Sequence, residues 1–297
     1  MPEESKPKMA MAFDQDGNPI QIPLDEWRDQ VLPRMLEETW GDPNLLYGVV
    51  TLAADNGLAS EVIEAVERAA EMDDHVERAA VMRAVIYFRA DRIDDAEKIL
   101  DEYLAQEART PSTLATLARI RQKKGDNEGF ENLLGESLQM DPNQDQALAW
   151  WADHHRDAYG EERETEALQK IAKHEGAWLP LIYLANKALR SGDKFGGIDI
   201  YKNAIEVSNY HKDALTVAAG DMLQHGHLIE MIDIIEPIYD SEVHGPNPGW
   251  SLVKGYLQTG QKRKGIMMLN KIEDPDRLDM KGPMEEMRER FTKLPEE

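Results

Sequence analysis

The chain has 297 residues, no cysteine, and 34 Lys and Arg against 57 Asp and Glu, for a formal net charge of −23. So acidic a chain repels phosphate backbones, which argues against a nucleic-acid partner and favours a basic or neutral protein partner. The absence of cysteine excludes disulfides, thiolate metal sites and cysteine nucleophiles. No stretch resembles the apolar core of a signal peptide, and no apolar run approaches the roughly 18 residues of a membrane helix. We therefore expect a cytoplasmic protein without membrane contact.

Residues 1–23 are expected to form an N-terminal arm or hairpin. The segment AFDQDGNPIQIP alternates apolar and polar residues around Asp16-Gly17-Asn18, a pattern typical of a short hairpin turn. The run from Asp14 also resembles the start of a calcium-binding loop. That loop needs Gly at its sixth and Glu at its twelfth position, where this chain has Pro19 and Asp25. The hairpin is therefore the favoured interpretation.

Residues 24–42 are predicted to form an N-capping helix, whose apolar side consists of Leu24, Trp27, Val31, Leu32, Met35 and Leu36. Beyond it, turn-like residues recur at nearly constant spacing: Gly57, Asp91, Gly125, Gly160, Gly192, Gly226 and Gly260, separated by 34, 34, 35, 32, 34 and 34 positions. Each follows one stretch of helical apolar periodicity and precedes another. The sequence therefore predicts a tandem array of helix–turn–helix units.

This period resembles the tetratricopeptide repeat (TPR), a 34-residue helix–turn–helix unit. The family has small residues at its eighth and twentieth positions, where the paired helices cross. The eighth positions here hold Val50, Ala84, Ala118, Ala152, Ala185, Ala219 and Val253, and the twentieth hold Val62, Ala96, Phe130, Ala167, Gly197, Met231 and Gly265. Phe130 and Met231 depart from the pattern, so we expect those two pairs to splay or repack.

The resemblance covers residues 43–275 and implies an all-α fold, a right-handed α-solenoid of about seven TPR-like repeats. Residues 276–297 are expected to form a C-terminal capping helix and tail, with the helix following Pro283. Solenoids need such caps because an open end repeat would expose its stacking face to water.

The resemblance also implies that the first helix of each unit lines a concave groove. Projecting the groove positions of the family onto this chain selects ten candidates for peptide or protein binding: Tyr47, Met82, Phe88, Arg119, Trp150, Asp153, Tyr183, Asn186, Trp250 and Lys254. Aromatic anchors with few charges suit an extended or helical peptide. The alternative for any of these aromatic residues is packing within the array.

Other sites of known chemistry receive no support. The carboxylate clamp of the family would need Lys, Arg and Asn across three consecutive units, but Asn186 stands alone at a ninth position and Arg78 at a second. His154 and His155 diverge by about 100° on a helix, and no HExxH occurs. His225 and His227 flank a turn, where solvent exposure or helix capping is the usual role. No nucleophile elbow, phosphate loop or Rossmann fingerprint is present. We predict no catalytic residue, metal or cofactor, hence no enzyme.

The segment LAWWADHH (148–155) combines aromatic, acidic and imidazole side chains. Helical spacing places Leu148, Trp151, Ala152 and His155 on the inward face, and Trp150 and Asp153 toward the groove. His154 should be the more exposed histidine. Two functional hypotheses remain: a scaffold that binds a peptide or protein segment in the groove, and a structural protein that forms homodimers through its repeat ends or N-terminal arm.

Overall fold

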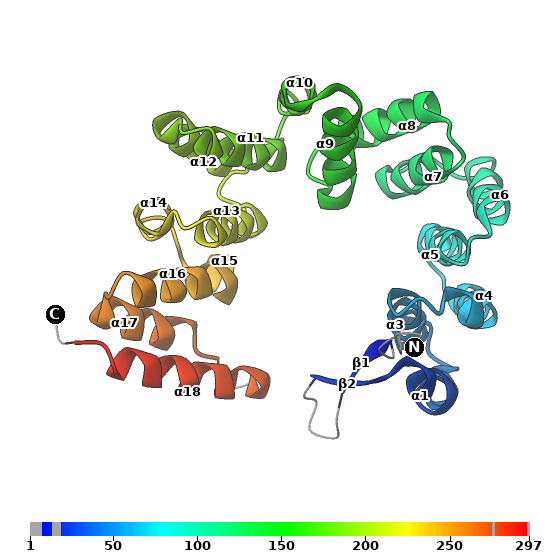
Figure 1. The fold of residues 1–297 in the computed structure, drawn as a ribbon, viewed down its shortest axis with the longest axis horizontal. Helices are drawn as coiled ribbons and strands as arrows, with labels where there is room; N and C mark the ends of the chain where they lie inside the picture. The colour runs from blue at the N-terminus through cyan, green and yellow to red at the C-terminus, as the bar shows by residue number, and fades with distance from the viewer. Residues whose placement is uncertain (1–7, 14–18, 275–276, 296–297) are drawn as a thin grey trace, which may run out of the picture. The chain divides into compact units, whose positions relative to one another are not determined.

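The computed structural model describes residues 8–13, 19–274 and 277–295 (Figure 1). The chain divides into two compact units, residues 1–140 and 141–297. Almost every described element is a helix, and short turns connect them. No helix in the described ranges is long and apolar enough to cross a membrane.

The first unit starts with two short strands, followed by helices. Its elements are β1 (Met9–Phe13), β2 (Pro19–Pro23), α1 (Leu24–Glu26), a π-helical turn (Trp27–Val31), α2 (Leu32–Thr39), α3 (Pro43–Asp55), a 3₁₀ turn (Ala59–Val62), α4 (Ile63–Met72), α5 (Val76–Arg89), α6 (Ile93–Leu104), α7 (Pro111–Lys123) and α8 (Asn127–Met140). Figure 1 shows α3, α5 and α7 in one row and α4, α6 and α8 in a second row beside it.

The second unit continues the alternation of first and second helices. It contains α9 (Asp145–Tyr159), α10 (Glu161–Ile171), α11 (Trp178–Arg190), α12 (Lys194–Val207), α13 (Lys212–Gln224), α14 (Leu228–Ile235), α15 (Ser241–His244), α16 (Pro246–Gln258), α17 (Lys262–Ile272) and α18 (Leu278–Thr292). The first helices α11, α13 and α16 pack against one another in succession.

The N-terminal hairpin is confirmed. β1 and β2 pair antiparallel, with Met9 opposite Pro23 and Phe13 opposite Pro19. Ala10 is 1% exposed and belongs to the same apolar cluster as Trp27 and Leu46, so the hairpin packs on its own unit. The turn at 14–18, where we placed the hairpin turn and considered a calcium loop, lies outside the described residues.

Residues 24–39 form the expected helix, with a wide turn in its middle. Pro33 has no N–H to donate, and its ring would clash with the carbonyl of Asp29 four residues earlier. The π-helical turn at Trp27–Val31 contains that carbonyl and relieves the conflict. Trp27 is fully buried, so this helix covers the first repeat through its indole ring.

The turns explain why the helix pairs recur. All seven predicted turn residues have positive φ, from 60° at Asp91 to 93° at Gly192. At Gly57 the N–H of the next residue, Leu58, bonds to the Ala53 carbonyl, and the same pattern recurs at five more turns: Asp91, Gly125, Gly192, Gly226 and Gly260. Two backbone hydrogen bonds close this kind of helix end, and the residue at the turn must take the left-handed backbone conformation. Glycine adopts that conformation most readily. Gly160 differs, since it alone separates α9 from α10.

The structure confirms an all-α array of helix pairs. A Cβ on Gly197 would lie 2.7 Å from the Leu189 side chain and 3.0 Å from the Ala185 carbonyl oxygen, so α11 and α12 approach closely there. Phe130 and Met231 are both fully buried. The Met231 methyl group occupies the space beside Gly255, where a Cβ would lie 2.6 Å from it. The larger residue in that pair is therefore accommodated by repacking against the next first helix.

The C-terminal helix starts earlier than predicted. α18 begins at Leu278 and contains Pro283, whereas the sequence suggested a start after that proline. Phe291 of α18 is fully buried against Gly265, where a Cβ would overlap the phenyl ring. The sequence also did not predict α15. His244 at its end is buried and accepts a hydrogen bond from the Asp240 N–H at 2.9 Å.

Candidate peptide-binding surface

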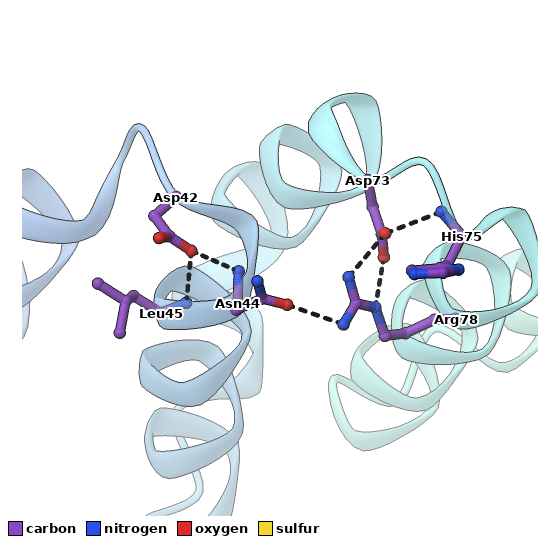
Figure 2. A network of polar contacts seen from close by, with 6 residues as sticks. All are labelled: Asp42, Asn44, Leu45, Asp73, His75 and Arg78. Atoms are coloured by element: carbon purple, nitrogen blue, oxygen red, sulfur yellow. Dashed lines mark hydrogen bonds and ion pairs between the residues drawn. The ribbon is translucent and has the colours of Figure 1, made fainter.

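In the first unit, a polar network joins the starts of α3 and α5 (Figure 2). Arg78 donates to both carboxylate oxygens of Asp73, at 2.6 and 2.7 Å, and to Asn44 Oδ1 at 2.8 Å. Asp73 also accepts from the His75 N–H at 2.9 Å. The Nε, Nη1 and Nη2 atoms of Arg78 thus each donate to a partner within the unit. The Arg78 guanidinium therefore links the start of α3 to the start of α5.

The same network buries the predicted groove residue Tyr47. Its ring lies under the Arg78 guanidinium, 5.5 Å from the centroid, and only 6% of the residue is exposed. Burial, with the negative charge of Asp73, raises the pKa of Tyr47 to about 12. The Arg78 hydrogen bonds, with a smaller contribution from the His75 N–H, lower the pKa of Asp73 to about 2. Tyr47 therefore packs in the array, which is the alternative that we considered for the aromatic candidates.

The other candidates of this unit are half-buried. Met82 packs against the cluster that contains Tyr47 and lines a pocket of about 550 Å³ at the start of α5. Phe88 packs against the apolar cluster of α5, α6 and α7. Arg119 donates to Gln122 on its own helix, and burial lowers the pKa of Arg119.

In the second unit, α9 carries the LAWWADHH segment. Leu148, Trp151 and Ala152 are buried as predicted. His155 Nδ1 lies 2.9 Å from the Trp151 carbonyl oxygen, and the two rings are 4.2 Å apart. His154 and His155 are both half-buried, so His155 is not part of the buried core that its place on the inward face predicted.

The outward residues of α9 differ in their surroundings. Trp150 is half-buried, whereas Asp153 is exposed. Arg156 Nη2 donates to Asp153 Oδ1 at 2.7 Å, and Arg156 Nε lies 3.3 Å from Asp157. Asp153 and Arg156 therefore neutralise each other on the helix surface.

A pocket of about 530 Å³ opens on the first helices α9, α11 and α13. Two predicted groove residues, Tyr183 and Asn186, line it together with Arg156, Arg190, Val217 and His225. Glu164 of α10 lies at its margin and pairs with Lys187. This pocket brings two predicted binding residues of α11 together with residues of the preceding and the following first helix.

The start of each helix around the pocket is positioned by side chains. Asn143, just before α9, donates to the Gly176 carbonyl at 2.8 Å and accepts from the Leu179 N–H at 2.9 Å. These bonds hold the start of α11 beside the start of α9. Tyr183 donates to Asp145 Oδ1 at 3.5 Å across the same junction. Burial and the charges of Asp145, Asp153 and Asp221 raise the pKa of Tyr183 to about 12, so its hydroxyl stays protonated at neutral pH.

The floor of the pocket is a fixed hydrogen-bond network. Asn186 Nδ2 lies 3.1 Å from both oxygens of Asp221, and a carboxylate only accepts, so the amide nitrogen must face it. Tyr201, fully buried on α12, donates its hydroxyl to Asp221 from behind. His225 Nδ1 is 2.9 Å from the Asp221 carbonyl oxygen and 3.0 Å from Asn186 Nδ2. With its proton on Nδ1, His225 can donate to the Asp221 carbonyl oxygen, while its Nε2, 3.4 Å from Asn186 Nδ2, can accept from the amide.

The last two candidates lie elsewhere in the second unit. Trp250 is half-buried in a separate pocket of about 320 Å³ beside Met284 of α18. Its indole Nε1 is buried and has no hydrogen-bond partner among the described residues. Lys254 is exposed. Neither residue lines the pocket of Tyr183 and Asn186.

Sequence reasoning missed three residues of that pocket. Asp221 occupies the tenth position of its helix, which the family projection leaves out, and Asp145 is the first residue of its own. His225 is exposed and caps the end of α13, as expected for a turn histidine, but its contact with Asn186 and its place in the pocket were not predicted. The sequence could have indicated Asp221, because it lies 35 residues after Asn186, one repeat length plus one residue. In the described ranges, no three His, Cys, Asp or Glu side chains are placed to hold a metal ion.

The sequence matches no protein-family model and no curated protein. Among solved structures, yeast Tom70 is similar at 14% identity with a TM-score of 0.47, over 89% of this chain and 58% of Tom70. The C-terminal part of a TPR repeat-containing protein from Cytophaga hutchinsonii aligns at 11% identity with a TM-score of 0.37, over 81% of this chain and 98% of that protein. The TPR2AB domain of yeast Sti1, solved as a complex with pHSP90, aligns at 12% identity with a TM-score of 0.32, over 88% of this chain and 100% of that domain. The chain thus spans 58% of the length of Tom70.

Proposed function

We propose that this protein is an interaction scaffold that binds a peptide or protein segment at the pocket of Tyr183 and Asn186. The observation that carries the proposal is an open pocket of about 530 Å³ on three successive first helices. Its walls combine an aromatic ring, an exposed valine and amide groups. Such a mixture suits a peptide, whose main chain needs polar partners and whose side chains need apolar contact.

Preorganisation supports binding at this place. Asn186 is held by Asp221, and Tyr201 holds Asp221 from the buried side. A ligand would therefore meet groups that are already oriented, which lowers the entropy cost of association. The corresponding surface of the first unit offers Arg78 only as part of a completed network.

The test begins with the purified full chain and a library of random 12-residue peptides displayed on phage. Enriched peptides are synthesised, and their Kd values are measured by isothermal titration calorimetry. Val217→Arg places a long side chain in the pocket, where Val217 is 37% exposed. We expect it to weaken binding at least about tenfold, roughly 1.4 kcal/mol.

Val207→Arg is the matched control, because Val207 is 41% exposed at the end of the second helix α12, outside the pocket. It should bind the peptides as the unchanged chain does. Equal affinity of both variants and the unchanged chain, or no enrichment of any peptide, would refute the pocket as the binding site.

Self-association through the N-terminal arm is the second candidate function. The sheet of the described residues has two strands, so β1 and β2 each pair along one edge only. An open strand edge can pair with another chain. Light scattering across a range of concentrations, with and without residues 1–23, tests this. A monomer at every concentration in both forms would exclude dimerisation through the arm.

A further inference from the structure

We infer that the pocket of Tyr183 and Asn186 selects a cationic side chain, Lys or Arg, of the bound segment and places it between the carboxylates of Asp145 and Asp221. This inference rests on the proposed function, because it names the ligand class of the same pocket. It runs opposite to the carboxylate clamp that the sequence lacks.

The groups on the pocket floor that are available to a ligand are mostly hydrogen-bond acceptors. Both donor positions of the Asn186 amide nitrogen face Asp221 and His225. The amide oxygen of Asn186 accepts no hydrogen bond from any described residue. Tyr183 directs its hydroxyl proton to Asp145, which leaves its oxygen lone pairs available. A ligand that enters here must therefore donate, and ammonium and guanidinium groups donate without accepting.

Asp145 and Asp221 contribute negative charge to the pocket, and the basic group nearest to Asp221 is the imidazole of His225, with Nδ1 3.3 Å from Asp221 Oδ1. In the part of the chain that the structure describes, Asp145 and Asp221 form no ion pair with any Lys or Arg. Asp145 is exposed, and Asp221 keeps 22% of its side chain exposed, so both can be reached. A cation placed near two carboxylates and an aromatic ring gains Coulomb attraction and contact with the ring face.

The basic residues that line the pocket do not cancel this field. Arg156 is paired with Asp153 and Asp157, and Lys187 with Glu164. Arg190 is exposed at the end of α11 and forms no ion pair among the described residues. Arg190 therefore leaves one positive charge in the pocket lining, which opposes a bound cation.

The experiment uses the peptides enriched on the full chain and asks whether they contain a required Lys or Arg. Each basic residue is replaced by Met, which keeps the length of the side chain and removes its charge. For the critical position, we expect a 10- to 100-fold loss of affinity, the range of one charge-assisted hydrogen-bond site. The affinity of the unsubstituted peptide should fall as salt rises from 0.05 to about 0.5 M, because screening weakens charge attraction.

Protein variants then locate the contact. Asp145→Asn keeps an acceptor for Tyr183 but removes the charge, and it should lower the affinity about tenfold for the Lys or Arg peptide only. For the Met peptide, the Asn variant and the unchanged chain should bind alike. Asp199→Asn, on the exposed face of the second helix α12, removes the same charge away from the pocket and should change neither affinity. Arg190→Gln should strengthen binding of the basic peptide, since it removes a positive charge from the pocket.

The possible results separate the two proposals. Peptides that lose affinity with Val217→Arg but need no Lys or Arg would overturn the cation inference and leave the proposed function standing. A basic residue that is required, yet equally so in Asp145→Asn and Asp199→Asn, would place the cation elsewhere and also overturn it. Peptides insensitive to Val217→Arg would refute the proposed function itself. Circular dichroism of each variant distinguishes loss of binding from loss of folding.

Discussion

The two units use the junctions between successive first helices in different ways. In the first unit, Arg78 joins Asp73 and Asn44 in a closed network that leaves Tyr47 buried beneath it (Figure 2). In the second, Asn186 and Asp221 form an equally fixed network at the floor of an open pocket. Both networks join one repeat to the next. The difference teaches that repeat position alone does not make a binding residue; the residue must also keep unused hydrogen-bond capacity that solvent can reach.

The largest effect is expected from opening the closed network. Asp73→Ala removes the acceptor of Arg78 and of the His75 N–H, and should lower the free energy of unfolding by about 2 kcal/mol at pH 7. Urea denaturation followed by circular dichroism measures it. Asp74→Ala is the control, since this exposed neighbour should change stability by less than about 0.5 kcal/mol. Equal stability of the two variants would mean that the network contributes nothing.

The stability that Asp73 contributes through its contact with Arg78 should depend on pH. The pKa of Asp73 is about 2 in the folded protein, below its ordinary value of 3.8. A depressed carboxylate pKa stabilises the fold above the unfolded value, and this contribution is lost as the pH falls through the folded value. The stability difference between the unchanged chain and Asp73→Ala should hold from pH 6 to about 4 and shrink toward pH 2. A difference that stays constant over this range would contradict the assigned charge contribution.

Removing one tyrosine hydroxyl from each unit, that of Tyr201 and that of Tyr47, compares how much each contributes to the free energy of unfolding. Tyr201→Phe removes the hydroxyl that supports Asp221 from behind, and should lower the free energy of unfolding by about 1 kcal/mol. It should also weaken any peptide bound at the pocket, because Asn186 loses the fixed carboxylate that orients it. Urea denaturation and calorimetry with an enriched peptide provide the two measurements. Unchanged values in both would show that the support from Tyr201 is dispensable.

The smallest effect is expected for Tyr47→Phe. The Tyr47 hydroxyl is buried and forms no hydrogen bond of normal geometry in the described part of the chain, and Asp73, the acceptor nearest in effect, is already held by Arg78 and the His75 N–H. Its removal leaves no partner unsatisfied, so the free energy of unfolding should stay within about 0.5 kcal/mol of the original or rise. The measurement is the same urea denaturation used for Tyr201→Phe. A loss as large as that of Tyr201→Phe would show that the first-unit network extends to this hydroxyl.

Much of the fold could be predicted because its determinants are local. The left-handed turn residues from Gly57 to Gly260, and the helices that they join, follow from backbone preferences within a few positions. The burial of Phe291 against Gly265 could not be predicted, because it depends on how α18 packs on α17. Likewise, the accommodation of Met231 depends on Gly255, 24 residues further along the chain.

The candidate site was predictable only in part. Tyr183 and Asn186 were found from their repeat positions, and the structure brings them together in one pocket. Tyr47 was chosen by the same rule and is buried, because Arg78 and Asp73 close over it. Asp221 was overlooked because its role depends on the distance between α11 and α13 and on Tyr201 behind it.

The sequence by itself therefore determined the period, the helix pairs and the acidity of the chain, since each depends on residue type and short-range spacing. Tertiary structure decided which polar side chains are consumed by their neighbours and which remain available to a ligand. The physical reason is that a buried hydrogen bond is satisfied by whichever group the packing of distant helices brings within about 3 Å, and one sequence position carries no record of that distance.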